Sequence, residues 1–331
     1  MNEMREQMVQ MAVGYWLSKA VHEAARLGIA DALAGGPRPA AGLAADAGVD
    51  AENLHRLLRA LASVGVFTET EPGSFGLTPH AEFLRSDHPA SMRHFAMMVG
   101  GDLFEVWCDL DHALTTGGSA VEKRFGKNFF AEIAQDEQKS QVFDKAMQEV
   151  HGAETAMMVE QFDWSPFEVI LDVGGGNGST LEGILGANEG ARGQLFELPQ
   201  VIDHARGYLE AAGLLDRVDL LPGDFFEAVS GDADAIVLRH VLHDWNDEAS
   251  AAILRNSRAA LRDGGRVLIV EKVITPGNEP EFAKLLDLNM MAIGGKERTE
   301  AQYAALLESV GLTLEAVHVL PGPTDIVEAR A

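Results

Sequence analysis

The sequence predicts an α/β protein in which a mainly helical N-terminal part precedes a mostly parallel sheet with helices on both faces. Up to about residue 165, apolar residues recur at helical spacing. From residue 168, short β-branched runs alternate with helical stretches, which is the pattern of a parallel sheet. The 331 residues suit about two domains. We predict divisions at 1–95, 96–165 and 166–331, the middle range being a helical linker.

Composition excludes several functional classes. Lys and Arg number 26 against 51 Asp and Glu, a net charge of −25 that disfavours binding to nucleic acid or to anionic membranes. Cys108 is the single cysteine, so an internal disulfide is impossible. The N-terminus carries Glu3 and Glu6 without a continuous apolar segment, and no run of about 18 apolar residues occurs. We therefore expect a cytoplasmic protein without signal peptide or membrane span.

The first element that we expect is a helix over residues 4–34. Met4, Met8, Met11 and Tyr15 recur at helical spacing, and no glycine pair interrupts the segment before residue 35. A stripe this apolar needs a large partner surface. Either the core of the chain or a dimer interface would provide one, and the sequence leaves both open.

Residues 39–83 have the pattern of a winged helix. Asp50 is placed to cap a helix whose leucines follow i, i+3, i+4, i+7 spacing, and Pro72-Gly73 is typical of a hairpin turn. Such a module often binds DNA. Here the second helix offers only Arg56 and Arg59 in a strongly acidic chain. The charge therefore favours a packing or dimerisation scaffold over a DNA-binding regulator.

The remaining elements follow in order. Residues 90–165 are expected to be helical, with bulky side chains such as Trp107 that suit either a core or a flat aromatic ligand. Seven strands are then expected, in the segments EVILDVGG, GQLFELP, VDLLPGD, ADAIVLRH, GRVLIVEKV, LTLEAVHVL and TDIVEAR.

A glycine-rich turn follows the first of these strands. Gly174, Gly176 and Gly178 permit a sharp turn and the close approach of a ligand to the backbone, and a helix is expected to begin near residue 179. Glu197 lies 23 residues beyond Gly174, a suitable distance for a carboxylate that binds ribose hydroxyls. Glycines at every second position, preceded by the Asp172 carboxylate, suit a cationic, amino-acid-bearing ligand. The spacing therefore favours S-adenosylmethionine over a dinucleotide.

Five sequence blocks resemble one known family: LDVGGGNGS, FELPQV, GDFF, LRHVLHDWNDE and GGKERT. They are similar to the class I S-adenosylmethionine-dependent O-methyltransferases, specifically the small-molecule group of plant caffeate and flavonoid enzymes and bacterial antibiotic-tailoring enzymes. The resemblance covers essentially the whole chain. It implies a Rossmann-like methyltransferase domain after a winged-helix dimerisation domain, and a homodimer formed through that domain. The implied cofactor is S-adenosylmethionine, converted to S-adenosylhomocysteine.

The resemblance also implies roles for cofactor-binding residues. Gly174 and Gly176 would cradle the methionine part of the cofactor, beside the Asp172 carboxylate. Glu197 would bind the ribose, although the plant enzymes have Asp there. The remaining candidates are Asp224 and Phe225, which would flank the adenine, and Arg239, whose cofactor contact stays open because the plant enzymes commonly carry Lys there.

His243 is the candidate base. It follows the strand of residues 235–238, at the edge where α/β sheets bind ligands, and imidazole titrates near neutral pH. The family's catalytic base falls on it, and His240 is the competing candidate. Glu271 ends the next strand and should reach the same edge, and Glu297 in GGKERT is a second carboxylate that the family brings beside the histidine. A carboxylate on the far ring nitrogen would fix the tautomer.

The expected reaction is O-methylation of an aromatic or polyketide-like small molecule. His243 would deprotonate a phenolic hydroxyl, and the phenolate would attack the sulfonium methyl in line. Asp and Asn ligands for magnesium are not evident, so we expect no metal. Candidate acceptor contacts are Asn289, Met290, Asp244 and Trp107, although residues 287–293 also suit an ordinary amphipathic helix. N- or C-methylation, or hydroxylation, decarboxylation or cyclisation on the same fold, stays open.

Overall fold

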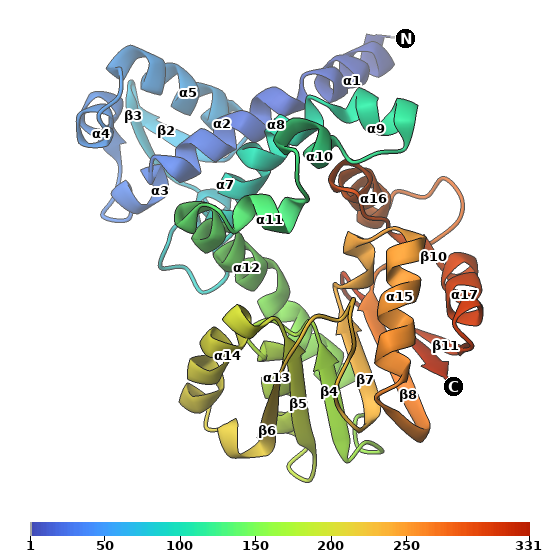
Figure 1. Cartoon of the computed structure of the whole chain (residues 1–331). Coiled ribbons are helices and arrows are strands. Elements are labelled where there is room, and N and C mark those ends of the chain that lie inside the picture. The colour runs from blue at the N-terminus through green and yellow to red at the C-terminus, as the bar shows by residue number, and fades with distance from the viewer. Residues whose placement is uncertain (1) are drawn as a thin grey trace. The chain divides into compact units, whose positions relative to one another are not determined.

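The structure, a computed structural model, describes residues 2–331. These residues form two compact units (Figure 1). The first unit runs up to Asp109 and includes Phe129–His151, and the second comprises Leu110–Asn128 and Gly152–Ala331. Residues 96–165, which we expected to form a helical linker, are divided between the two units.

The first unit is helical with one small sheet. Its elements are α1 (Asn2–Ala12), α2 (Gly14–Arg26), α3 (Ile29–Ala32), β1 (Arg38–Pro39), α4 (Ala40–Ala47), α5 (Ala51–Ser63), β2 (Phe67–Glu71), β3 (Ser74–Leu77), α6 (Pro79–Glu82), α7 (Arg93–Gly100), α8 (Asp102–Trp107), α11 (Phe129–Ile133) and the first part of α12 (Glu137–Gln161). The antiparallel order β1-β3-β2 and the Asp50 cap, which accepts from the Asn53 N–H at 2.9 Å, fit the predicted winged helix.

The N-terminal helix differs from the prediction of one continuous segment. It breaks at Val13 and again at Gly28, whose φ of +65° lies in the left-handed region. A single glycine is thus enough to end the helix there, because it adopts this conformation without the steric penalty of a Cβ. None of the described residues of α1 is buried. The methionine stripe therefore does not belong to the core of this chain.

The second unit carries the large sheet. Its elements are α9 (Leu110–Thr116), α10 (Ala120–Phe125), the end of α12, β4 (Val169–Val173), α13 (Ser179–Ala187), β5 (Arg192–Glu197), α14 (Pro199–Ala211), η1 (Leu215–Arg217), β6 (Val218–Pro222), β7 (Ala233–Arg239), η2 (Leu242–Asp244), α15 (Asp247–Arg258), β8 (Leu261–Glu271), β9 (Val273–Ile274), α16 (Phe282–Ile293), β10 (Arg298–Thr299), α17 (Glu300–Ser309), β11 (Thr313–Val319) and β12 (Asp325–Arg330). Within residues 2–331, no helix has the length and apolar character needed to cross a membrane.

All seven predicted strands lie in one sheet, in the order β11-β12-β8-β7-β4-β5-β6 (Figure 1). Strands β8, β7, β4, β5 and β6 run parallel, whereas β12 pairs antiparallel with both β8 and β11. Because β4 and β7 are neighbours, the glycine-rich turn after β4 and the histidine-bearing turn after β7 meet at one edge of the sheet.

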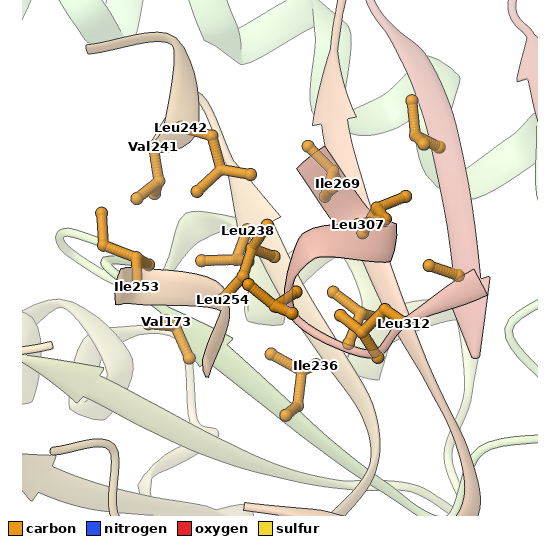
Figure 2. Packing of buried hydrophobic residues seen from close by; sticks show 14 of the residues in the cluster. Val173, Ile236, Leu238, Val241, Leu242, Ile253, Leu254, Ile269, Leu307 and Leu312 are labelled. Atoms are coloured by element: carbon orange, nitrogen blue, oxygen red, sulfur yellow. The ribbon is translucent and has the colours of Figure 1, made fainter. Parts of the chain in front are cut away.

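Two hydrophobic clusters cover the two faces of this sheet. Ile236 and Leu238 of β7 belong to one cluster and Val237 to the other, as expected for side chains that alternate along a strand. Figure 2 shows the first cluster, in which Val241 and Leu242 pack with residues of β7, α15 and α17. The turn that carries His243 is therefore anchored in the core by the two residues that precede it.

Candidate active site

The turn after β4, here called the cofactor loop (residues 172–179), adopts a backbone that requires glycine. Gly174, Gly176 and Gly178 have φ values of +71°, +57° and +87°. A Cβ on Gly174 would also lie 3.0 Å from the Val241 side chain. Helix α13 begins at Ser179, the last residue of the loop, so its N-terminal N–H groups and positive dipole end lie at this edge.

Glu197 connects the end of β5 to the cofactor loop. Its Oε2 accepts from the Gly176 N–H at 3.2 Å, and its Oε1 accepts from the Leu198 N–H at 2.7 Å. Burial raises its pKa, which the two backbone N–H groups partly offset. The Gly223 N–H donates to the Glu197 carbonyl, which brings Asp224 to the same edge. The predicted ribose and adenine residues are thus neighbours in the fold.

An aromatic group stands beside this edge. The rings of Phe225 and Phe226 lie 4.9 Å apart, and Trp245 contacts Phe226 at 4.8 Å and Phe225 at 6.2 Å, all edge to face. A Cβ on Gly174 would lie 3.6 Å from Phe225. Only Phe225 was expected here. The other two rings offer further apolar surface for a flat heterocycle.

Asp172 is completely buried behind the loop. Neither carboxylate oxygen has a hydrogen-bond partner among the described residues, and burial raises its pKa to about 7 although Arg239 opposes the shift. A Cβ on Gly175 would lie 2.3 Å from Oδ2, so this carboxylate sits directly beneath the loop backbone. An unsatisfied buried carboxylate is unfavourable, and such groups call for an explanation such as a missing ligand.

Arg239 and His240 form a second polar group below the loop. The Arg239 guanidinium donates to Thr155 at 2.6 Å and to Glu154 at 3.0 Å. His240 Nε2 lies 3.0 Å from the same Glu154 oxygen, and His240 has a φ of +50°, which is strained for a histidine. The rival base is therefore paired with a carboxylate of α12, and Arg239 is directed toward α12 and α13.

His243 lies in the turn after β7, here called the base turn (residues 240–247). The residue is only 8% exposed, and its Nδ1 lies 2.8 Å from Glu297 Oε1. This contact leaves Nε2 as the nitrogen available to a substrate. Asp244 Oδ1 lies 3.6 Å from Nε2, on the side of the ring opposite Glu297. Glu297 therefore has the ring-orienting position that the sequence predicted for a carboxylate.

Glu271 reaches the same histidine in a different way from the one expected. Its Oε1 accepts from the backbone N–H of His243 at 3.0 Å, and its Oε2 accepts from the Tyr303 hydroxyl. Both Glu271 and Tyr303 are fully buried. Glu271 thus holds the backbone of the base turn, whereas Glu297 holds the ring.

The GGKERT segment crosses directly over the base turn. A Cβ on Gly295 would lie 2.0 Å from the His243 carbonyl oxygen, so only glycine fits there. The Lys296 N–H donates to that oxygen at 2.7 Å, and Arg298 donates to the carbonyls of Leu242 and Trp245 at 3.0 Å each. Each residue from 295 to 298 therefore contacts the base turn.

Carboxylates dominate the electrostatics around His243. Burial lowers the pKa of the imidazole. The charges of Asp244, Glu297 and Glu271 raise that pKa by a larger amount, so the net value lies well above 6.5. Burial raises the pKa of Asp244 and of Glu271, which the imidazolium partly offsets. The carboxylates therefore stabilise the imidazolium that His243 forms when it accepts a proton.

The proposed acceptor contacts are more dispersed. Asn289 and Met290 lie on α16, where Met290 is only 7% exposed, and Trp107 ends α8 in the other unit with 39% exposure. The exposed large apolar residues of α16 are instead Phe282, Leu285 and Leu288, at 68%, 63% and 40%. Sequence reasoning missed these three, and Tyr303 and Arg298 near the base. The GGKERT block gave a signal for Arg298, whereas Tyr303 had none.

Fold and site together define an α/β enzyme that binds a nucleoside cofactor at a glycine-rich turn and holds an oriented histidine beside it. Two family models match the chain: an O-methyltransferase domain over residues 107–313 and an O-methyltransferase dimerisation domain over residues 9–87. The matched ranges cover most of the sequence.

Individual relatives agree over the full length. The chain is 43% identical to the phenazine O-methyltransferase PhzM of Lysobacter antibioticus, over 98% of this chain and 95% of the relative. The crystal structure titled LaPhzM superposes with a TM-score of 0.94 at 42% identity, covering 99% of both chains. The O-methyltransferase NcsB1 of neocarzinostatin biosynthesis, solved with S-adenosylmethionine and 2-hydroxy-5-methyl naphthoic acid, has a TM-score of 0.86 at 35% identity, covering 95% of this chain and 96% of NcsB1. The chain belongs to the S-adenosylmethionine-dependent O-methyltransferase family.

Proposed function

We propose that this enzyme methylates a hydroxyl group of an aromatic small molecule and that His243 is the general base. The observation that carries the proposal is the 2.8 Å contact between His243 Nδ1 and Glu297 Oε1. With Nδ1 engaged, Nε2 is the nitrogen that accepts the hydroxyl proton, and the Glu297 carboxylate stabilises the imidazolium that results.

The cofactor loop suits S-adenosylmethionine. The cofactor supplies a methyl group on a sulfonium when it is bound. Gly174 and Gly176 let the methionine part approach the backbone, and the unpartnered Asp172 carboxylate beneath them provides a negative charge for a cationic ligand. Glu197 is proposed to bind the ribose hydroxyls, with Asp224 and Phe225 at the adenine. Arg239 is proposed to support this loop through Thr180, the second residue of α13, to which its guanidinium donates at 3.3 Å.

The acceptor is proposed to lie between His243 and α16. Asp244 Oδ1, on the Nε2 side of the ring, would accept from a donor group next to the reacting hydroxyl. Asn289 and Met290 of α16 remain proposed acceptor contacts, and the contact expected for Trp107 stays a prediction. Aromatic acceptors are supported by the naphthoic acid in the NcsB1 complex.

Substitution of the base tests the proposal. The His243→Gln variant should lose about 10²- to 10⁴-fold in kcat, the range for a general base. The probe acceptor is 2-hydroxy-5-methyl naphthoic acid, assayed by S-adenosylhomocysteine release. Calorimetric binding of S-adenosylhomocysteine should be unchanged, and His240→Gln serves as the matched control. Near-normal turnover by His243→Gln with cofactor bound would remove His243 from the mechanism.

Mass spectrometry of the product separates the alternatives. O-methylation adds the net mass of CH₂ to the acceptor, whereas hydroxylation, decarboxylation or cyclisation does not. Comparison of a phenol with the matching aniline then separates O- from N-methylation. The base oriented by Glu297 favours the hydroxyl, since a neutral aniline nitrogen needs no deprotonation before it attacks.

The dimerisation domain is proposed to pair through α1 and α2. Met4, Met8 and Met11 follow each other at helical spacing and are 67%, 63% and 75% exposed, and Tyr15 and Trp16 continue the apolar surface. Exposed apolar surface of this extent is typical of an interface. Met8→Glu should shift the sedimentation of the protein from dimer to monomer, whereas Gln10→Glu, elsewhere on α1, should not. The predicted cytoplasmic location stays a prediction.

A further inference from the structure

Arg298 is a fully buried charged residue to which the proposed reaction assigns no role. It begins β10, immediately after Glu297, and its exposure is 0%. Arginine is almost never fully buried unless it is paired. Its partners therefore indicate what its burial achieves.

The guanidinium uses all of its donors. Nε donates to Asp247 Oδ1, Nη1 to the carbonyls of Leu242 and Lys296, and Nη2 to the carbonyl of Trp245 and to Ser250 Oγ, at distances of 3.0 to 3.2 Å. Five N–H groups thus meet five acceptors. The carbonyls of Leu242 and Trp245 lie on either side of His243 in the chain, so Arg298 spans the residue that carries the base.

The same segment is fastened on the other side of Glu297. The Lys296 N–H donates to the His243 carbonyl at 2.7 Å, and Lys296 Nζ pairs with Asp247 at 2.8 Å. Glu297 is therefore flanked by two residues that each bind the base turn, while its own carboxylate binds the ring. The backbone positions of the base and its orienting carboxylate are fixed relative to each other.

We propose that Arg298 is a positioning residue that holds the base turn against β10, so that Glu297 Oε1 keeps its hydrogen bond to His243 Nδ1. The inference rests on the proposed role of His243 as base. Lysine cannot replace Arg298, because its three donors on a single nitrogen cannot reach acceptors spread over both sides of His243. The effect on the reaction is indirect, through the alignment of His243 and Glu297.

The test compares Arg298→Lys with the wild-type enzyme by two measurements. With 2-hydroxy-5-methyl naphthoic acid, kcat should fall about 10- to 100-fold, as expected for a misplaced catalytic group, while the KM for S-adenosylmethionine stays within about twofold. In the complex with S-adenosylhomocysteine, ¹⁵N NMR of labelled histidines should show a lower pKa for His243, assigned by its loss in His243→Gln. The titratable groups that face this ring are Asp244, Glu271, Glu297 and His240. Because each of them could shift the His243 pKa, all four are kept in both the wild type and Arg298→Lys.

The NMR measurement separates failure of this inference from failure of the proposed function. If His243→Gln retains activity, His243 is not the base of the proposed function, yet the titration still reports whether Arg298 controls the His243–Glu297 contact. In a Glu297→Gln background, Arg298→Lys should produce little further change in the His243 pKa. An equal change in both backgrounds would overturn the inference.

Arg217→Lys is the matched control. Arg217 also donates to three backbone carbonyls, those of Leu185, Asn188 and Ala191, but it lies in η1, away from the base turn. It should lower the unfolding temperature without altering kcat or the His243 titration. If Arg298→Lys behaves like this control, Arg298 is only structural. If Arg298→Lys does not fold, Asp247→Asn weakens the same clamp from the surface and should cause a smaller shift in the same direction, and its failure to do so would equally contradict the inference.

Discussion

The cofactor loop and the base turn follow adjacent strands of one sheet, β4 and β7, but treat their buried polar atoms differently. In the cofactor loop, both oxygens of Asp172 lack hydrogen-bond partners among the described residues. Around the base turn, Arg298 has five acceptors and Glu271 has a donor on each oxygen. Glu297 Oε2, however, has no hydrogen-bond partner among the described residues.

This difference in hydrogen bonding corresponds to a different role for each region. A buried carboxylate without a partner destabilises the fold, so its presence beneath the glycine loop indicates a site completed by a charged ligand. A cluster with satisfied hydrogen bonds is rigid before any ligand arrives, which is what orientation of a base requires. The first region is thus built for binding and the second for positioning, and three substitutions test the distinction.

The largest effect is expected at Glu297. Glu297→Gln should lower kcat by about 10²- to 10⁴-fold, because the histidine loses the carboxylate that orients it and stabilises its protonated form. Removing this charge also lowers the pKa of His243. Since the base acts when deprotonated, the acidic limb of the kcat profile should move to lower pH. Unchanged binding of S-adenosylhomocysteine by calorimetry would assign the loss to the base turn, and an unmoved limb would contradict the assignment.

An intermediate effect is expected at Asp172, where substitution should raise the stability of the cofactor-free protein but weaken cofactor binding. Its folded pKa is raised from 3.8 to about 7, so its contribution to stability is present below pH 3.8 and lost as the pH rises through 7. Asp172→Asn should therefore raise the free energy of unfolding of the cofactor-free protein by at most roughly 2–4 kcal/mol at pH 8. Near pH 4 the substitution should change it by almost nothing. Binding of S-adenosylmethionine should weaken about tenfold or more.

Denaturant unfolding at the two pH values, with calorimetry for the cofactor, measures both parts of this prediction. Asp234→Asn is the control, because Asp234 is hydrogen-bonded and its pKa is lowered in spite of partial burial. That variant should destabilise the protein at pH 8. Equal stability of Asp172→Asn and wild type at pH 8 would show that another group already satisfies Asp172.

The smallest effect is expected at Tyr303. Tyr303→Phe removes the hydroxyl that donates to Glu271 but leaves the Glu271 bond to the His243 backbone. Loss of one buried partner should lower stability by about 1–3 kcal/mol. The kcat should fall by less than in Glu297→Gln, because Glu271 contacts the backbone and not the ring. A larger loss of kcat in Tyr303→Phe would place Glu271, and not Glu297, in control of the base.

Local pattern predicted the seven strands of the large sheet and named candidate site residues at one edge of it. Strand periodicity and the glycine spacing located β4, the cofactor loop and Glu197, because these features depend on residues close in sequence. Local pattern failed over residues 4–34, where Val13 and Gly28 break the expected helix. It also could not distinguish a buried apolar stripe from an exposed one.

What the sequence by itself determined is the order of elements and which residues stand at the carboxyl edge of the sheet, since β-branched runs and glycine turns encode both locally. Only the tertiary structure decided which carboxylate holds the His243 ring. Glu271 and Glu297 lie 28 and 54 residues beyond His243, and no local pattern distinguishes them. The choice depends on how GGKERT crosses the base turn, where Gly295 permits the close approach and Arg298 fastens it. Long-range packing sets such contacts, and spacing along the chain does not encode them.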